Sequence, residues 1–333
     1  MSSIEKEIEE IKKEIRETPY NKSTEQHIGR LKAKLAKLKE EKVEKSKKQS
    51  GGEGYGIEKS GDATVILVGF PSVGKSTLLN SLTKAGSKVA DYEFTTLKVI
   101  PGTLKYRGAR IQILDVPGII SGASEGKGRG KEIMSVMRNA DLMLLMIEPS
   151  QLDQYQVIKK ELYDAGIRLN QSPPKVKIRK KDSGGLDIDS TVDLEISENE
   201  IKAILRENGI INADVSIREK LDSDRLIDSI MRNREYLPGL VLVNKIDLLD
   251  DDQLKEVQEF VEEKIDEDTL YISAKSGELG ELKEKIYENL GFIRIYLKPQ
   301  GEKADMDEPL VLKKEATVED LCKNLHKDFL NKF

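Results

Sequence analysis

Four short polar motifs in this sequence each follow an apolar stretch and combine residue types that bind nucleotides. The first is GFPSVGKS at residues 69–76, which fits GxxxxGK[ST] between an apolar stretch at 63–68 and an expected helix. Backbone N–H groups of such a turn surround phosphates, the lysine adds positive charge, and the hydroxyl can bind Mg²⁺. We therefore assign phosphate binding and catalysis to Lys75 and a metal contact to Ser76. Nucleotide contacts are expected from Gly69, Phe70, Pro71, Ser72, Val73, Gly74, Lys75, Ser76 and Thr77.

The second motif is Asp115-Val-Pro-Gly118, directly after the apolar stretch 111–114. An Asp-to-Gly turn is common, so this motif is weak by itself. Its position after an expected strand, about 40 residues beyond the lysine of the first motif, supports it. There the Asp115 carboxylate can hold Mg²⁺ through water and bind nucleotide, and the Gly118 amide can meet the terminal phosphate during catalysis.

The third and fourth motifs indicate which base is bound. Asn244-Lys245-Ile-Asp247 follows the apolar stretch 240–243, and the Asp247 carboxylate can accept two hydrogen bonds from guanine, a donor pair that adenine lacks. The fourth motif, Ser273-Ala274-Lys275, follows 270–272, and its backbone amide would face the guanine oxygen. Ligands of open α/β sheets bind at the carboxyl ends of the strands. All four motifs therefore predict one guanine-nucleotide site, for GTP or GDP.

The elements that position these motifs alternate between strands and helices. Strands are expected at 63–68, 111–114, 142–147, 240–243 and 270–272, and helices after Lys75, near Met134, and at 257–265 and 282–290. This alternation predicts an α/β domain with a doubly wound, mostly parallel sheet. We expect this domain to comprise residues 51–149 and 237–291.

Three further segments lie outside this domain. Residues 1–50 carry two apolar stripes with breaks near Pro19, which predicts a helical hairpin. Residues 150–236 contain a Gly-Gly hairpin signal at 184–185 and helical stretches at 198–207 and 222–234, which predicts an inserted α+β subdomain. In residues 292–333 we expect strands at 292–297 and 310–312, and a helix from Val318 to about Leu330 capped by Thr317 and Asp320.

Nearly the whole chain resembles the developmentally regulated GTP-binding (DRG) proteins of the Obg superfamily, which are translation-factor-related GTPases. The resemblance is most specific at 92–97, YEFTTL, and in the glycine-rich run 115–130. It implies a P-loop GTPase domain with a helical N-terminus, a ribosomal-protein-like insertion and a C-terminal β-grasp (TGS) domain that is incomplete at Phe333. It also implies that Thr96, with Thr95 as the alternative, closes on Mg²⁺ and the γ-phosphate, as metal ligand and in catalysis.

Two positions depart from related enzymes. Ras-type enzymes place a water-orienting glutamine directly after the glycine of the second motif, and this chain has Ile119 there. We therefore expect slow intrinsic hydrolysis, at or below the order of 10⁻² s⁻¹. Several relatives bind K⁺ through a P-loop asparagine, where this sequence has Ser72. Stimulation by K⁺ is accordingly an open expectation.

Composition and charge bear on where the protein works and what it contacts. Charged residues make up 35% of the 333, the net charge is −5, and Cys322 is the single cysteine. No apolar run approaches the ~20 residues of a membrane span, so we expect a cytoplasmic protein without membrane contact. Basic clusters at 30–48 and 175–181 suggest contact with RNA or the ribosome, or simply solvated surfaces. A regulatory protein partner is a further expectation.

The favoured function is therefore that of a slow GTPase that acts as a conformational switch on ribosomes, translation or RNA. The main alternative is a GTP-responsive module that binds RNA or the ribosome and hydrolyses GTP only incidentally. A P-loop ATPase or kinase would conflict with Asp247 as a reader of guanine. A purely structural RNA-binding protein would have only the basic clusters in its favour.

Overall fold

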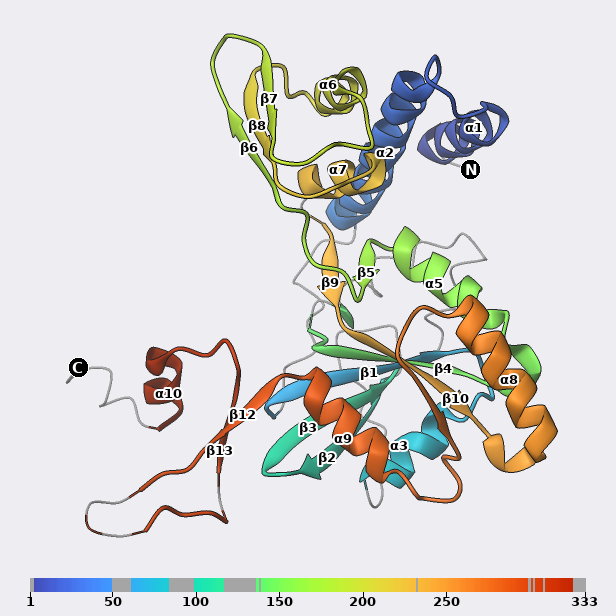
Figure 1. Cartoon of the computed structure of the whole chain (residues 1–333), viewed down its shortest axis with the longest axis vertical. Helices are drawn as coiled ribbons and strands as arrows, with labels where there is room; N and C mark the ends of the chain where they lie inside the picture. The colour runs from blue at the N-terminus through green and yellow to red at the C-terminus, as the bar shows by residue number, and fades with distance from the viewer. Residues whose placement is uncertain are drawn as a thin grey trace. The chain divides into compact units, whose positions relative to one another are not determined.

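The computed structural model describes residues 3–49, 61–83, 99–116, 136–137, 139–231, 233–298, 301, 303–307 and 309–325. The chain divides into two compact units (Figure 1). The first unit comprises Met1–Glu53 and Gln171–Tyr236, and the second comprises Gly54–Asn170 and Leu237–Phe333. None of the helices described is long and apolar enough to cross a membrane.

The second unit is built on a sheet of six strands. Along the chain these are β1 (Ala63–Gly69), β2 (Ile100–Tyr106), β3 (Ala109–Asp115), β4 (Leu142–Ile147), β10 (Gly239–Asn244) and β11 (Thr269–Ile272). Their order across the sheet is β11-β10-β4-β1-β3-β2. Neighbouring strands run parallel except β2, which is antiparallel to β3. The predicted mostly parallel α/β sheet is thus confirmed.

Helices cover both faces of this sheet. One face packs on α5 (Gln154–Asp164) and α8 (Asp251–Lys264), and the other on α3 (Lys75–Thr83) and α9 (Gly280–Asn289). The inner strand β4 is buried along its whole length because both of its faces lie under helices. Short 3₁₀ turns, η1 (Pro149–Gln151) and η2 (Ile246–Leu248), follow β4 and β10.

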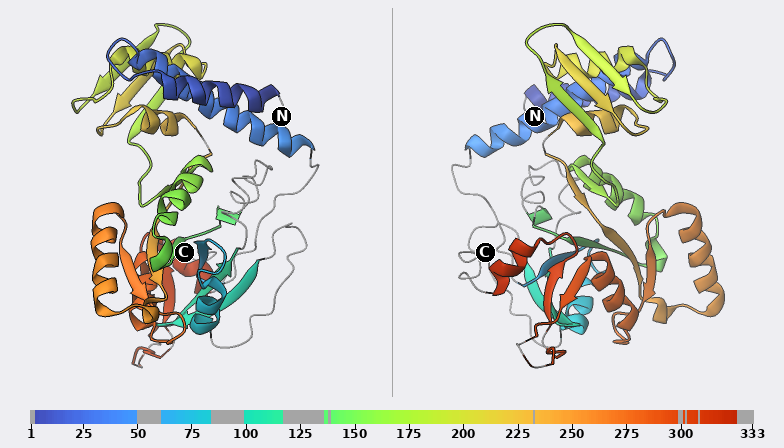
Figure 2. Two further views of the ribbon diagram at one scale, coloured as in Figure 1. Left: turned by 90° about the vertical axis from the view of Figure 1, so that its right-hand side faces the viewer. Right: turned by 60° about the vertical axis from the view of Figure 1, so that its left-hand side comes forward.

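The first unit joins the N-terminal helices to the insertion. It contains α1 (Ser3–Glu17), α2 (Glu25–Gln49), α6 (Glu198–Glu207), α7 (Ser223–Ile230) and the sheet β6 (Val176–Lys180), β7 (Leu186–Ser190) and β8 (Ala213–Ile217). The α2 residue Ala33 is fully buried in the same core as α6, α7 and β8. Figure 2 shows the N-terminal helices, in blue, beside the helices and strands of the insertion. The second segment of this compact unit starts at Gln171. Helix α5, which precedes it in the chain, packs on the sheet of the second unit.

The Gly-Gly hairpin expected at 184–185 is wrong. Strands β6 and β7 do not pair, because β8 lies between them, antiparallel to β6 and parallel to β7. Asn212, just before β8, makes hydrogen bonds to the loop that joins β6 to β7. Its Oδ1 accepts from the Gly185 N–H at 2.8 Å, and its Nδ2 donates to the Asp182 carbonyl at 3.2 Å.

The remaining strands form two-stranded pairs. β5 (Ile167–Leu169) pairs with β9 (Glu235–Leu237). β12 (Phe292–Ile295) pairs antiparallel with β13 (Leu310–Lys313), whose Val311 is buried in the core of the second unit. The expected cap of the last helix, α10 (Val318–Leu325), is present, since the Thr317 N–H donates to Asp320 Oδ2 and the Asp320 N–H donates to Thr317 Oγ1.

Candidate nucleotide-binding site

The parallel register brings the predicted motifs to one edge of the sheet. Leu67 pairs with Asp115 across β1 and β3, and Asn244 pairs with Ile272 across β10 and β11. The strands therefore end side by side, at the edge where open α/β sheets bind their ligands. The turn after β1, Asp115, and the loops after β10 and β11 all start from this edge.

The turn between β1 and α3 has the backbone that a phosphate-binding loop requires. Ser72 and Gly74 both have positive φ, at 66° and 101°. A side chain at position 74 would also collide with its surroundings, because a Cβ there would lie 2.4 Å from Asn244 Nδ2. Gly74 therefore meets two requirements, a backbone conformation and a close approach by Asn244.

Lys75 opens α3 and turns its ammonium back toward this loop. Its Nζ donates to the carbonyl oxygens of Gly69 and Phe70, both at 2.8 Å. An ammonium carries three N–H groups, and these two carbonyls take two of them. Burial lowers the pKa of Lys75 from its usual value, while the negative charge of Asp115 opposes that shift. The lysine thus presents a fixed positive charge within the phosphate-binding turn.

Asp115 and Ser76 offer oxygen ligands next to this lysine. The Ser76 hydroxyl donates to Asp115 Oδ2 at 2.7 Å. The other carboxylate oxygen, Oδ1, is buried and has no hydrogen-bond partner within the described part of the chain. Mg²⁺ prefers oxygen ligands, often one or two carboxylates together with phosphates. A buried carboxylate oxygen in need of a partner, beside a hydroxyl, fits that preference.

Asn244 connects two of the predicted motifs. Its side chain is 2% exposed, donates from Nδ2 to the Val73 carbonyl at 2.8 Å and accepts at Oδ1 from the Ala274 N–H at 2.9 Å. Ser81 of α3 donates to the Ala274 carbonyl at 2.7 Å. The phosphate-binding turn, the loop after β10 and the loop after β11 are therefore joined by hydrogen bonds between buried groups.

The loop after β10 places the residues expected to read the base. Lys245 has φ 69°, and Asp247 is exposed within η2. The fourth motif follows β11, with Ser273 and Ala274 buried and Lys275 exposed. Asp247 and Lys275 are thus both exposed in the loops that follow β10 and β11.

Glu148 is a residue that the motif search did not find. It follows β4 at the same edge, and its Oε2 forms an ion pair with Lys245 Nζ. Its own signal in the sequence is a single acidic residue directly after an apolar strand. Because Lys245 lies 97 residues further along the chain, only the fold brings the two together.

Three predicted positions lie outside the described residues: Thr96, Gly118 and the departure from Ras-type enzymes at Ile119. The same holds for Thr95 and for most of the helix expected near Met134, of which residues 136–137 are described as helical. The described residues bring together Lys75, Ser76, Asp115, Asn244 and Ala274.

Comparison with protein families matches three consecutive parts of the chain. Residues 64–181 match the family described as a 50S ribosome-binding GTPase, residues 183–292 match the C-terminal region of that domain, and residues 293–333 match the TGS domain. The chain is therefore a GTP-binding protein of the translation-factor-related GTPase type, built from a P-loop GTPase domain and a C-terminal TGS domain.

Full-length relatives give the family. An uncharacterised GTP-binding protein of Methanocaldococcus jannaschii is 56% identical over 99% of this chain and 84% of its own length. Developmentally regulated G-protein 3 of Arabidopsis thaliana is 44% identical, over 100% of this chain and 90% of its own. Developmentally regulated GTP-binding protein 2 of Homo sapiens is 43% identical over 100% of this chain and 91% of its own length. The chain belongs to the family of developmentally regulated GTP-binding proteins.

Proposed function

We propose that this protein binds GTP with Mg²⁺ at the carboxyl edge of the sheet and hydrolyses it slowly to GDP. The difference between the GTP-bound and GDP-bound states then serves as a conformational switch on ribosomes or RNA. The observation that carries this proposal is the Asp115 carboxylate. One of its oxygens accepts from Ser76, and the other is buried without a partner, next to the Lys75 ammonium. This arrangement suits a metal-bound triphosphate better than a neutral ligand.

The residues of the site have distinct roles in this proposal. Mg²⁺, held by Ser76 and Asp115, would neutralise charge that develops on the β- and γ-phosphates. Lys75 binds the same phosphates as a fixed cation. The backbone N–H groups of residues 69–77 surround them, helped by the N-terminus of α3. The family resemblance adds Thr96 and Gly118 as sensors of the γ-phosphate.

Base recognition rests on the two loops farther along the sheet. Asp247 accepts from the guanine N1–H and N2–H₂ groups, and the loop of Ser273, Ala274 and Lys275 presents an amide to the guanine oxygen. Asn244 keeps these loops in register with the phosphate-binding turn through Val73 and Ala274. Preference for guanine over adenine follows, since adenine would leave the carboxylate without its paired donors.

Slow hydrolysis follows from Ile119, whose side chain cannot orient a water molecule. The water must then be positioned by backbone groups, by a monovalent cation or by a regulatory protein partner. Ser72 occupies the P-loop position at which several relatives have a K⁺-binding asparagine, and its backbone is left-handed. We therefore propose Mg²⁺ as cofactor and keep K⁺ stimulation as a measurable alternative.

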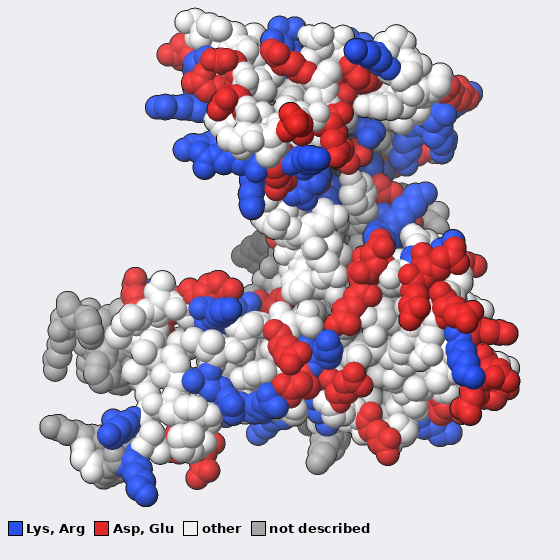
Figure 3. All heavy atoms as spheres, viewed as in Figure 1, with Lys and Arg blue, Asp and Glu red and all other residues white. Residues whose placement is uncertain are grey.

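The contact with RNA or the ribosome is proposed for the basic strand β6. Lys177 and Arg179 are exposed there, and β6 is the edge strand of its sheet, with β8 as its neighbour. In Figure 3, Lys and Arg side chains project from this side of the first unit. Lysines of the 30–48 segment fit an external contact less well, because several neutralise acidic partners within the first unit. These pairs are Lys34–Glu7 at 2.7 Å, Lys42–Glu5 at 2.9 Å and Lys32–Asp224 at 2.8 Å.

The acidic side of the same sheet limits how RNA could lie on it. The register sets Arg179 beside Asp214 and Asp214 beside Asp187, all on the outer face. A phosphate backbone would be attracted by Lys177 and Arg179 on β6 and repelled by Asp187 on β7, two strands away. The proposed contact is therefore an edge contact along β6, with a strong dependence on salt.

Single-turnover hydrolysis of GTP, measured with and without ribosomes in K⁺ and in Na⁺ buffers, tests the proposal. We expect a slow basal rate and acceleration by ribosomes. An unaccelerated rate together with GTP-dependent ribosome binding would favour the alternative, a binding module in which hydrolysis is incidental. Equal affinity for ATP and GTP would refute the site. Equal rates in the two buffers would remove K⁺ from the proposal. We expect the protein to work in the cytoplasm.

A further inference from the structure

The side chain of Lys245 is held in an unusual position at the nucleotide-binding edge. Its backbone has φ 69° and ψ 31°, the left-handed conformation that residues other than glycine seldom adopt. Such conformations persist where surrounding contacts enforce them, often at ligand sites. From this backbone the ammonium reaches Glu148, so the lysine chain crosses from the end of β10 to the end of the neighbouring strand β4.

Glu148 is itself fixed. It is the N-cap of η1, with extended backbone followed by Pro149, whose ring restricts φ. Its Oε1 accepts from the Ser150 hydroxyl at 3.1 Å, while Oε2 pairs with Lys245. The side chains of Lys245 and Glu148 are 33% and 17% exposed, so the pair is partly shielded from water. The hydrogen bond from Lys245 lowers the pKa of Glu148, which keeps the carboxylate ionised near neutral pH.

The direction of this lysine chain matters for a bound base. A guanine read by Asp247 has to lie against the loop after β10, and its phosphates have to reach the turn after β1. Strand β4 lies between β10 and β1. The four-carbon chain of Lys245, stretched toward the end of β4, therefore runs along the path from the base to the phosphates, with its charged group anchored at the far end.

We propose that Glu148 is a positioning residue for nucleotide binding, which holds the Lys245 chain as a fixed apolar wall beside the guanine ring. Glu148 itself does not touch the nucleotide. The inference rests on the proposed placement of guanine at Asp247. Without Glu148 the lysine would sample many rotamers, and each binding event would have to order it again.

The expected effect has a distinct signature. Replacing Glu148 should weaken GDP and GTP binding equally, by about 10-fold, which corresponds to about 1.4 kcal/mol. The loss should appear as faster dissociation, because a wall shields a bound base and has little influence on encounter. The hydrolysis rate of GTP already bound should stay the same, since the groups around the γ-phosphate are unchanged. A defect in the phosphate site would instead separate GTP from GDP.

The experiment compares Glu148→Gln with Glu148→Asp and with the control Asp268→Asn. Asp268 precedes β11 at the opposite edge of the sheet, and its ion pair with Lys285 spans 3.0 Å. For each full-length variant, the dissociation constants and dissociation rates of fluorescent GDP and of a non-hydrolysable GTP analogue are measured. Single-turnover hydrolysis follows, and thermal unfolding without nucleotide checks the fold.

We expect Glu148→Gln to raise both dissociation constants about 10-fold, Glu148→Asp to lie between it and the wild type, and Asp268→Asn to match the wild type. Equal values for Glu148→Gln and Asp268→Asn would overturn the proposal, as would a change confined to GTP or to turnover. Should the glutamine variant not fold, unchanged affinity in Glu148→Asp would overturn it.

A separate variant distinguishes failure of this inference from failure of the proposed site. Asp247→Asn should shift preference from guanine toward xanthine nucleotides. If that preference does not shift, the placement of the base is wrong and the proposed function loses its guanine site. If it shifts while Glu148→Gln binds like the wild type, the site stands and the role of Glu148 is wrong.

Discussion

Replacing Asn244 with alanine should destabilise the second unit and weaken GDP and GTP binding together. The side chain is 2% exposed and makes one hydrogen bond as donor, to the Val73 carbonyl, and one as acceptor, from the Ala274 N–H. Alanine removes both bonds and leaves their backbone partners in place. The phosphate-binding turn and the loop after β11 would then no longer be joined.

The expected loss of stability follows from the two backbone groups, the Val73 carbonyl and the Ala274 N–H, that would be left without a hydrogen bond. A buried donor or acceptor that loses its partner costs about 1–3 kcal/mol, so a value of about 1.5 kcal/mol for each gives about 3 kcal/mol. In a unit of this size each kcal/mol lowers Tm by about 2–4 °C, and the expected fall is about 6–12 °C. Nucleotide affinity should fall as well, since binding must now also bring the two loops together.

Thermal unfolding of the nucleotide-free protein measures this prediction, with Asn289→Ala as a matched control. Asn289 also donates to a backbone carbonyl, that of Lys285 at 2.9 Å, but at an exposed position. Asn244→Asp offers a second check, because a carboxylate can still accept from Ala274 but sets a negative oxygen against the Val73 carbonyl. Its loss should be at least as large as that of alanine. A Tm for Asn244→Ala within 2 °C of the control would refute the reasoning, since about 3 kcal/mol is expected to separate them.

Three further outcomes are expected. Gly74→Ala should lower nucleotide affinity by more than about 10-fold in calorimetry, because its Cβ would lie 2.4 Å from Asn244 Nδ2. Gly209 also has a positive φ, +74°, but an added Cβ there would meet no other atom within 4 Å. Gly209→Ala should therefore show only the effect of the strained backbone, and a loss of nucleotide affinity equal to that of Gly74→Ala would contradict the steric argument. Asp115→Asn should weaken the Mg²⁺ dependence of GTP binding in a magnesium titration, and an unchanged dependence would exclude Asp115 as a ligand. Burial raises the pKa of Glu200 in the folded protein above its value in the unfolded chain. The stability that this residue contributes is therefore fully present at a pH below the unfolded-state pKa and is lost as the pH rises through the folded-state pKa. The advantage of Glu200→Gln over the wild type in urea unfolding should therefore grow from pH 4.5 upward, and a constant difference would argue against this.

Five strands of the central sheet, β1, β3, β4, β10 and β11, could be predicted from sequence because they appear as mostly apolar runs that lie under helices. The sixth strand, β2, could not, because it is an antiparallel edge strand that is only partly buried and has no such run. The stretch 142–147 has the same bounds in the structure as β4. The motifs could be predicted because each stands directly after such a run, and a parallel sheet gathers these ends at one edge. Local pattern and three-dimensional position thus coincide in this part of the molecule.

Other features depend on contacts that no local pattern records. The split of β6 from β7 requires β8 to enter between them, with Asn212 holding the loop. Helix α7 ends at Ile230 although the expected helix continued to 234, and the chain beyond it is bonded by Arg234 to Asp228. The pair of Glu148 and Lys245 needs two adjacent strands to end side by side.

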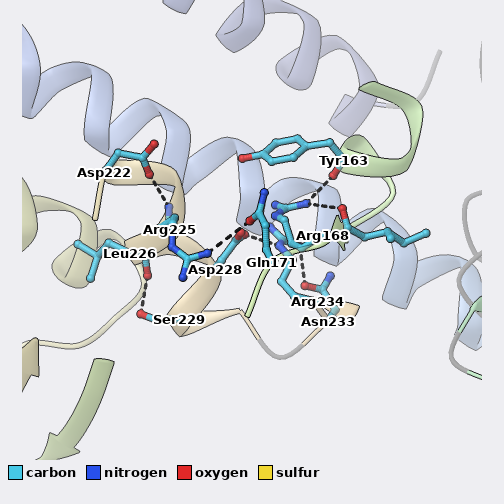
Figure 4. A network of polar contacts seen from close by, with 11 residues as sticks. Tyr163, Arg168, Gln171, Asp222, Arg225, Leu226, Asp228, Ser229, Asn233 and Arg234 are labelled. Atoms are coloured by element: carbon cyan, nitrogen blue, oxygen red, sulfur yellow. Dashed lines mark hydrogen bonds and ion pairs between the residues drawn. The ribbon is translucent and has the colours of Figure 1, made fainter. Parts of the chain in front are cut away.

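The structure of the first unit bears on how the proposed switch would reach the insertion. Helix α7 holds the incoming chain through Arg225, whose guanidinium donates to Gln171 Oε1 at 3.3 Å (Figure 4). The same guanidinium also donates to the Ser172 carbonyl at 3.2 Å. It holds the outgoing chain through the pair of Asp228 with Arg234, at 2.6 Å. Because α2 also packs in the same core, the N-terminal helices and the insertion form one body instead of two separate appendages. A nucleotide-dependent change that reaches the insertion through these chain passages would therefore act on α2 and β6 together, so the basic edge proposed to contact RNA would respond as part of a whole unit.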